Sequence, residues 1–97
     1  MEKRISENRL SYLEEGKEVA YVLFHKTAED RILITKTFVD DSKRGCGLAV
    51  KLMEDILLLA EKEDCRICAT CSYAEHYFTK KGEKRFLPLD TPEEQQL

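Results

Sequence analysis

The chain has 97 residues, of which 42% are hydrophobic, so it is large enough for one domain built around a single core. Its net charge of −3 argues against a general nucleic-acid binder, whose surface needs an excess of basic side chains. The longest apolar run is too short to cross a bilayer and no apolar stretch follows the first residues. We therefore expect a soluble, cytoplasmic protein with no membrane partner, whose four cysteines stay reduced.

The N-terminal part of the chain predicts strands separated by turns. Ile5 and the apolar residues of 10–13 suggest a first pair of short strands with a boundary near Asn8. A turn at 15–17 contains a glycine. Residues 18–27 are rich in Val, Tyr, Leu and Phe, which favours a longer strand.

Residues 31–39 have the clearest strand signal. Apolar side chains occur at both parities of this run, which is typical of a central strand. Alternation along the run places Ile32, Ile34 and Phe38 on one face and the remaining apolar residues on the other.

Residues 48–63 predict an amphipathic helix, because apolar side chains recur at spacings of three and four. These apolar residues are Leu48, Ala49, Leu52, Met53, Ile56, Leu59 and Ala60. Lys51 and Asp55 are then expected to form an opposite-charge pair on the solvent side of the helix.

A short buried strand at 65–70 and a second helix are the last predicted elements. Ser72 and Glu75 have the spacing of a capping box, which predicts Ser72 as the N-cap residue of this helix. Gly82 is its predicted stop, because glycine is favoured just past the end of a helix.

The order of these elements predicts the fold class. Residues 1–88 are expected to form one α/β domain of α+β character, with a mostly antiparallel sheet and two packed helices. The strand–helix–strand unit of 31–70 predicts one parallel junction in that sheet. Residues 89–97 have little to bury, so we expect a flexible tail.

The segment from Arg44 to Ala49 joins the predicted central strand to the first helix and contains two glycines and an alanine. So little side-chain bulk lets a phosphate reach several N–H groups at the positive end of a helix. The segment differs from a Walker A loop and from the dinucleotide fingerprint in its glycine spacing. It predicts a site for a ligand that carries a pyrophosphate, and the alternative is an ordinary glycine-rich turn.

Two motifs resemble the GNAT superfamily of N-acetyltransferases. The sequence Arg-x-x-Gly-x-Ala at 44–49, between a strand and a helix, is similar to the coenzyme A loop of that superfamily. The stretch from Cys71 to Lys80, Cys-Ser-Tyr-Ala-x-x-Tyr-Phe-x-Lys, is similar to a short, stand-alone group within it. The resemblance extends from Ile5 to Phe86 and so covers most of the chain.

The resemblance implies an enzyme that transfers an acetyl group from acetyl-coenzyme A to a primary amine, which attacks the thioester directly. The acceptor is then a small molecule or a protein amine, and the chain acts as a monomer or a weak homodimer. In the superfamily the loop amides bind the pyrophosphate and the preceding strand binds the pantetheine arm. The residues implied in cofactor binding here are Thr37, Phe38, Val39, Arg44, Gly45, Cys46, Gly47, Leu48 and Ala49.

Cys71, Tyr73 and Tyr77 are the catalytic candidates. Cys71 directly precedes the predicted N-cap of the second helix, where the positive end of the helix favours a thiolate. Its thiol would protonate the departing thiolate, orient the amine or carry the acyl group, and the alternative is a small buried side chain. The two tyrosines would act as general acids, or else as packing aromatic rings.

The chain departs from the superfamily at two positions that bear on catalysis. Lys36 stands where the short group usually has His, and a protonated lysine would repel a cationic amine. Phe78 stands four residues before Gly82, where many members have a tyrosine that acts as general acid. An acyl-coenzyme A binding or regulatory module with little catalysis is therefore the alternative function.

Cys65, Cys68 and Cys71, followed by His76, suggest a second alternative, a cysteine-based redox or metal sensor. On a strand Cys68 faces away from the other two cysteines, so the three thiols do not converge on one ion. We therefore expect no metal site.

Overall fold

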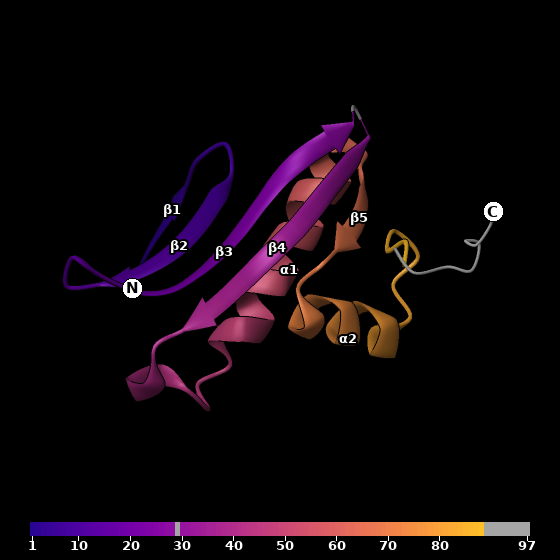
Figure 1. Cartoon of the computed structure of the whole chain (residues 1–97). Coiled ribbons are helices and arrows are strands. Elements are labelled where there is room, and N and C mark those ends of the chain that lie inside the picture. The colour runs from indigo at the N-terminus through magenta and orange to yellow at the C-terminus, as the bar shows by residue number, and fades with distance from the viewer. Residues whose placement is uncertain (29, 89–97) are drawn as a thin grey trace.

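The computed structural model describes residues 1–28 and 30–88, and it confirms the predicted order of elements. The predicted tail at 89–97 lies outside the described residues. In chain order the elements are β1 (Glu2–Ile5), β2 (Arg9–Glu14), β3 (Lys17–Ala28), β4 (Arg31–Val39), the short 3₁₀ helix η1 (Asp41–Lys43), α1 (Leu48–Glu63), β5 (Arg66–Ala69) and α2 (Ser72–Lys81) (Figure 1).

The strands form one five-stranded sheet in the order β1-β2-β3-β4-β5. All neighbours are antiparallel except β4 and β5, which α1 connects in parallel, as the sequence predicts. Both helices pack on the same face of the sheet (Figure 1). Among the described residues no helix covers the other face, so the fold has two layers and one open sheet face.

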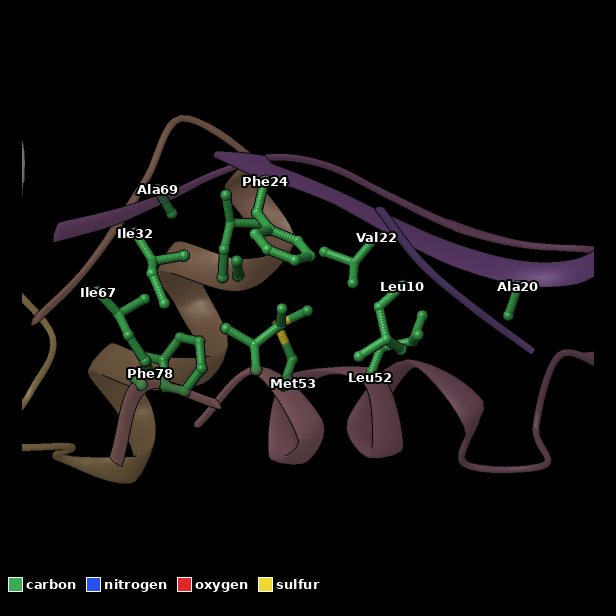
Figure 2. Packing of buried hydrophobic residues seen from close by; sticks show 14 of the residues in the cluster. Leu10, Ala20, Val22, Phe24, Ile32, Leu52, Met53, Ile67, Ala69 and Phe78 are labelled. Carbon is green, nitrogen blue, oxygen red and sulfur yellow. The ribbon is translucent and has the colours of Figure 1, made fainter. Parts of the chain in front are cut away.

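The hydrophobic core lies between the sheet and the two helices. Leu52, Met53 and Ile56 of α1 are fully buried, which confirms the predicted apolar stripe of that helix. Leu52 and Met53 face Val22 and Phe24 of β3 (Figure 2), and Ile56 belongs to the same cluster. Burial of this stripe holds α1 against the sheet, since each large apolar side chain removed from water contributes about 1.5–3 kcal/mol.

A β-bulge in β4 overturns the predicted alternation of that strand. Leu23 pairs with Lys36 while the next residue, Phe24, pairs with Ile34, so β4 carries one extra residue at Thr35. The extra residue reverses which side chains face the helices from that point on. Ile34 is buried in the core, whereas Phe38 lies on the open face, so the prediction of one shared face for these residues was wrong.

The start of α2 differs by one residue from the prediction. Cys71 is the N-cap residue, with extended backbone, and Ser72 is already the first helical residue. The N–H of Glu75 donates to the carbonyl of Cys71 at 3.0 Å, and no side chain caps this helix end. The predicted capping box was therefore wrong, because the backbone is still extended at Cys71 and the helix begins only after it.

The contacts of Asp55 differ from those predicted. The hydroxyl of Tyr12 in β2 donates to its carboxylate, and Lys3 Nζ of β1 lies 3.5 Å from Asp55 Oδ1. Lys51 Nζ instead lies 5.8 Å from the centre of the Tyr12 ring. The expected solvent-side pair is thus replaced by contacts that join α1 to the first two strands.

Candidate functional site

The parallel pair β4 and β5 opens into a fork. The two strands pair over Arg31–Ile34 and Arg66–Ala69 only. At the base of the fork the carbonyl of Ile34 accepts hydrogen bonds from the N–H groups of Thr70 and Cys71, at 3.0 and 3.4 Å. The second half of β4 therefore has no described strand beside it on this side, which leaves part of an inner strand as an open edge.

The bulge decides which residues of β4 face the fork. The N–H of Asp40 donates to the carbonyl of Val19 at 2.8 Å, so the backbone groups of Asp40 and Phe38 point toward β3. Backbone groups alternate along a strand, so those of Thr37 and Val39 point into the fork. Phe38 does not reach it, because its ring stacks on Tyr21 on the open sheet face, with centroids 5.1 Å apart.

A cleft of about 410 Å³ joins the fork to the start of α1. It brings together most of the residues that the sequence singles out for cofactor binding, together with one of the three catalytic candidates. Its lining residues are Thr37, Val39, Lys43, Arg44, Gly45, Gly47, Leu48, Ala49, Val50 and Tyr73. Val50 is absent from the expected set, although it stands in the first turn of the predicted helix.

The loop before α1 has a backbone that favours glycine. Gly45 and Gly47 have φ values of 86° and 79°, in the left-handed region that other residues rarely adopt. A Cβ atom at either glycine would meet no atom within 4 Å, so the cleft is open above both. The two glycines therefore expose the loop backbone to the cleft, as the motif predicts.

No described side chain caps the N-terminus of α1. Gly47 is the N-cap residue, no side chain hydrogen-bonds to this helix end, and the first turn contains no acidic residue. The first N–H groups of a helix have no partner within the helix. Those of Leu48, Ala49 and Val50 are therefore available to an anion, whereas the N–H of Cys46 donates to the carbonyl of Lys43 at 3.4 Å.

Two basic side chains border this helix end. Lys43 Nζ lies 2.5 Å from Glu14 Oε1, and this hydrogen bond raises the pKa of Lys43 above its usual value. Arg44 Nε lies 3.2 Å from Asp41 Oδ1, and the Arg44 side chain is 71% exposed. Both cations line the cleft, and each is held by a carboxylate in the free protein.

Cys71 meets β4 at the base of the fork. Its thiol donates a hydrogen bond to the hydroxyl of Thr37 at 3.4 Å. Cys71 is half-buried and packs against the core, while Thr37 lines the cleft. Cys71 therefore contacts the cleft only indirectly, because its thiol is bonded to the hydroxyl of Thr37.

The two candidate tyrosines differ in their access to the cleft. Tyr73 lines it and is 37% exposed, and burial of its ring, aided by nearby Tyr77 and Cys71, raises its pKa above the usual value. The Tyr77 ring stacks on that of Tyr73, with centroids 6.3 Å apart, and does not line the cleft. Phe78 is fully buried and stacks on Phe86. Tyr73 is therefore the phenol that the structure brings to the cleft.

The remaining cysteines are spread over the molecule. Cys46 is exposed in the loop, whereas Cys65 and Cys68 are buried. Across residues 1–28 and 30–88, no three His, Cys, Asp or Glu side chains are arranged to hold a metal ion. Neither of the described helices is long and apolar enough to span a membrane.

Comparison with known families identifies the chain. The family profile described as GCN5-related N-acetyl-transferase matches residues 9–87. The chain belongs to this family. A comparison with curated proteins gave no match.

Solved structures of other N-acetyltransferases share the fold. A GCN5-like protein from Staphylococcus aureus, solved by NMR, superposes with a TM-score of 0.73 at 26% identity, over 92% of this chain and 90% of that chain. A ribosomal-protein-alanine N-acetyltransferase from Brucella melitensis biovar Abortus 2308 gives 0.62 at 17% identity, over 75% of this chain and 61% of its own. A GNAT family acetyltransferase from Elizabethkingia anophelis, solved with acetyl-CoA bound, gives a TM-score of 0.61 at 13% identity, over 76% of this chain and 51% of that chain. This GCN5-related chain thus spans almost all of the first structure and much less of the other two.

Proposed function

We propose that this GCN5-related protein binds acetyl-coenzyme A in the cleft and transfers the acetyl group to a primary amine of a small molecule or a protein. The observation that carries the proposal is one cleft that joins the open edge of β4 to the uncapped N-terminus of α1. An extended, amide-bearing arm is suited to a strand edge, and a phosphate is suited to a helix N-terminus. Membership of an acetyltransferase family supports the same ligand.

The residues of the cleft fit the coenzyme. N–H groups of Gly45, Gly47, Leu48 and Ala49 are proposed to hold the pyrophosphate, since no acidic side chain stands in the first turn to oppose it. Thr37 and Val39 line the same cleft, and their backbone groups are proposed to pair with the pantetheine arm. Arg44 lines the cleft as well, and the two remaining residues of the expected set take no direct part in this proposal. They are Phe38, on the open sheet face, and Cys46, whose N–H is bonded within the loop.

The coenzyme would supply an acetyl thioester. The carbonyl carbon would form a bond to the amine nitrogen, its bond to sulfur would break, and the proton that the nitrogen loses would pass to solvent. A backbone N–H at the edge of β4 is proposed to stabilise the oxygen that becomes negative during the attack. Tyr73 is proposed to donate the proton that the departing sulfur needs, because it is the candidate phenol that lines the cleft and a phenol is protonated at neutral pH. Tyr77 positions Tyr73 through the ring stack, and Cys71 positions Thr37 through its thiol.

The cytoplasm is the proposed compartment. None of the four described cysteines forms a disulfide, which suits a reducing environment.

The second candidate function is a coenzyme-binding module with little catalysis. It is favoured by Phe78, which is buried in the core where many family members have a catalytic tyrosine. The two candidates predict the same binding and differ in amine-dependent release of the coenzyme thiol.

Calorimetric titration with acetyl-coenzyme A tests the site. We expect saturable binding by the native chain and loss of binding by Gly47→Glu, which places a negative charge at the helix N-terminus. Gly16→Glu is the matched control, because Gly16 also has a positive φ of 82° and open space around its Cβ position but lies in the turn between β2 and β3. Equal affinity in both variants, or no binding by the native chain at millimolar coenzyme, contradicts the proposal. An amine panel then separates the two candidate functions.

A further inference from the structure

The two strands that form the fork are basic, although the whole chain is acidic. β4 and β5 together contain Arg31, Lys36 and Arg66 and no Asp or Glu, whereas the net charge of the chain is −3. Charges of one sign beside a site attract ligand groups of the opposite sign. Arg31 and Arg66 pair at the closed end of these strands, so Lys36 is the one of the three cations that lies in the half of β4 exposed by the fork.

Lys36 is the cation on the open sheet face directly beside the fork. The bulge at Thr35 turns its side chain away from the helices, and its Nζ lies 6.0 Å from the centre of the Tyr21 ring. Tyr21 stacks on Phe38, so an apolar aromatic surface adjoins the ammonium group. Within residues 1–28 and 30–88 no carboxylate forms an ion pair with Lys36.

Glu18 forms an ion pair with Arg9, the cation that stacks on Tyr21. Glu18 accepts two hydrogen bonds from Arg9, at 2.5 and 3.0 Å, and one from Ser11 at 2.5 Å. The guanidinium of Arg9 also lies 4.2 Å from the centre of the Tyr21 ring. Glu18 therefore has no free capacity to attract a second cation to this face.

The open face is the side from which an acceptor has access to the fork. The cleft proposed for the coenzyme lies on the helix side, where Thr37 and Val39 face α1 and α2. No described helix covers the opposite side of the sheet. In the proposed reaction the amine approaches from the side that the coenzyme leaves free, and the Lys36 side chain lies on that side.

We infer that the acceptor is an amine whose own molecule carries a carboxylate, which Lys36 binds while the aliphatic linker lies on Tyr21 and Phe38. The inference rests on the proposed acetyl transfer and names its substrate class. A molecule whose second charged group is another ammonium is disfavoured, because that group would lie beside Lys36 and be repelled. The same carboxylate chemistry is offered by a small amino acid and by an acidic peptide.

Matched acceptors test the inference by steady-state kinetics at saturating acetyl-coenzyme A. We expect kcat/KM for 4-aminobutyrate to exceed that for 1,4-diaminobutane, which has the same chain length, by about fivefold or more, with butylamine between them. Lys36→Met should remove the preference for 4-aminobutyrate, mainly by raising its KM. Lys36→Glu should reverse the preference. Lys62→Glu, an equal charge change near the end of α1, should leave it unchanged. Peptides in which the acceptor lysine is flanked by Glu or by Arg test whether a peptide supplies the carboxylate. Faster turnover of the peptide with Glu is expected if it does.

A binding experiment on the free protein needs no turnover. Glutarate should shift the backbone amide NMR signals of Tyr21, Lys36 and Phe38, and Lys36→Glu should abolish the shifts, whereas 1,5-diaminopentane should cause none. Preference for the diamine, or shifts that persist in Lys36→Glu, would overturn the inference and leave acetyl transfer standing. Bound acetyl-coenzyme A with no turnover of any amine would overturn the transferase proposal, while the glutarate shifts still decide whether Lys36 binds carboxylates.

Discussion

The thiol of Cys71 donates a hydrogen bond to the hydroxyl of Thr37 over 3.4 Å, at the base of the fork between β4 and β5. This contact joins the N-cap residue of α2 to the strand edge that lines the cleft. A change in either side chain therefore alters the edge of β4 without touching the loop before α1.

Removal of this contact should lower turnover more than coenzyme affinity. We expect Cys71→Ala and Thr37→Val each to reduce kcat by about tenfold, because a misplaced strand edge loses part of its stabilisation of the developing charge. Cys71→Ser keeps a donor and should retain more activity than Cys71→Ala. Steady-state kinetics with a parallel calorimetric titration provide the check, and unchanged turnover in Cys71→Ala removes this residue from the mechanism.

Phe78→Tyr should destabilise the protein without activating it. Phe78 is fully buried and stacks on Phe86, so an added hydroxyl has no access to the cleft. A hydroxyl buried without a partner costs about 1–3 kcal/mol. Urea unfolding measures this loss, and a rise in kcat for the variant would show that position 78 reaches the reacting groups.

Glu14 should weaken coenzyme binding by holding Lys43. Its carboxylate lies 2.5 Å from the ammonium that borders the helix N-terminus. Glu14→Gln should raise the affinity for coenzyme A about two- to fivefold, as expected for an exposed ion pair, and Lys43→Met should lower it. Glu15→Gln is the control, since the neighbouring Glu15 is exposed and does not line the cleft. Equal affinities of Glu14→Gln and Glu15→Gln would rule out competition for Lys43.

Alkylation should distinguish Cys46 from the buried cysteines. Cys46 is exposed in the loop, while burial raises the pKa of the Cys68 thiol and slows its reaction. We expect N-ethylmaleimide to modify Cys46 first and to block coenzyme binding, and bound coenzyme A to slow the modification. Mass spectrometry of the peptides reports the site. Undiminished binding after complete modification of Cys46 would place the phosphates elsewhere.

Alkaline pH should destabilise the protein partly through Tyr12. Burial and the hydrogen bond to Asp55 raise the pKa of Tyr12 in the folded state above its usual value near 10. Its contribution to stability is therefore complete below about pH 10 and is lost as the pH rises toward the folded-state pKa. Tyr12→Phe should lower the free energy of unfolding by about 1–2 kcal/mol at pH 7 and reduce its decline above pH 10. Urea unfolding from pH 7 to 11 provides the measurement, and parallel pH profiles would exclude Tyr12 as a source of the decline.

Local patterns in the sequence were enough to predict the elements and the loop. The apolar spacing of 48–63 requires one buried helix face, and the glycines at 45 and 47 leave open space over the loop backbone, as the motif predicts. The strand–helix–strand order then restricts β4 and β5 to a parallel pair. These features depend on neighbours in the chain, so the sequence by itself determined the fold class and the position of the cleft.

Contacts between distant segments decided the rest. The bulge at Thr35 depends on the pairing of β4 with β3, and it turns Lys36 and Phe38 to the open face. The pairing of Glu14 with Lys43 and the contact of Cys71 with Thr37 likewise join segments far apart in the chain. No periodicity or spacing carries this information, because register and side-chain pairing are set by the packed sheet as a whole. Tertiary structure therefore decided which of the candidate residues share the cleft.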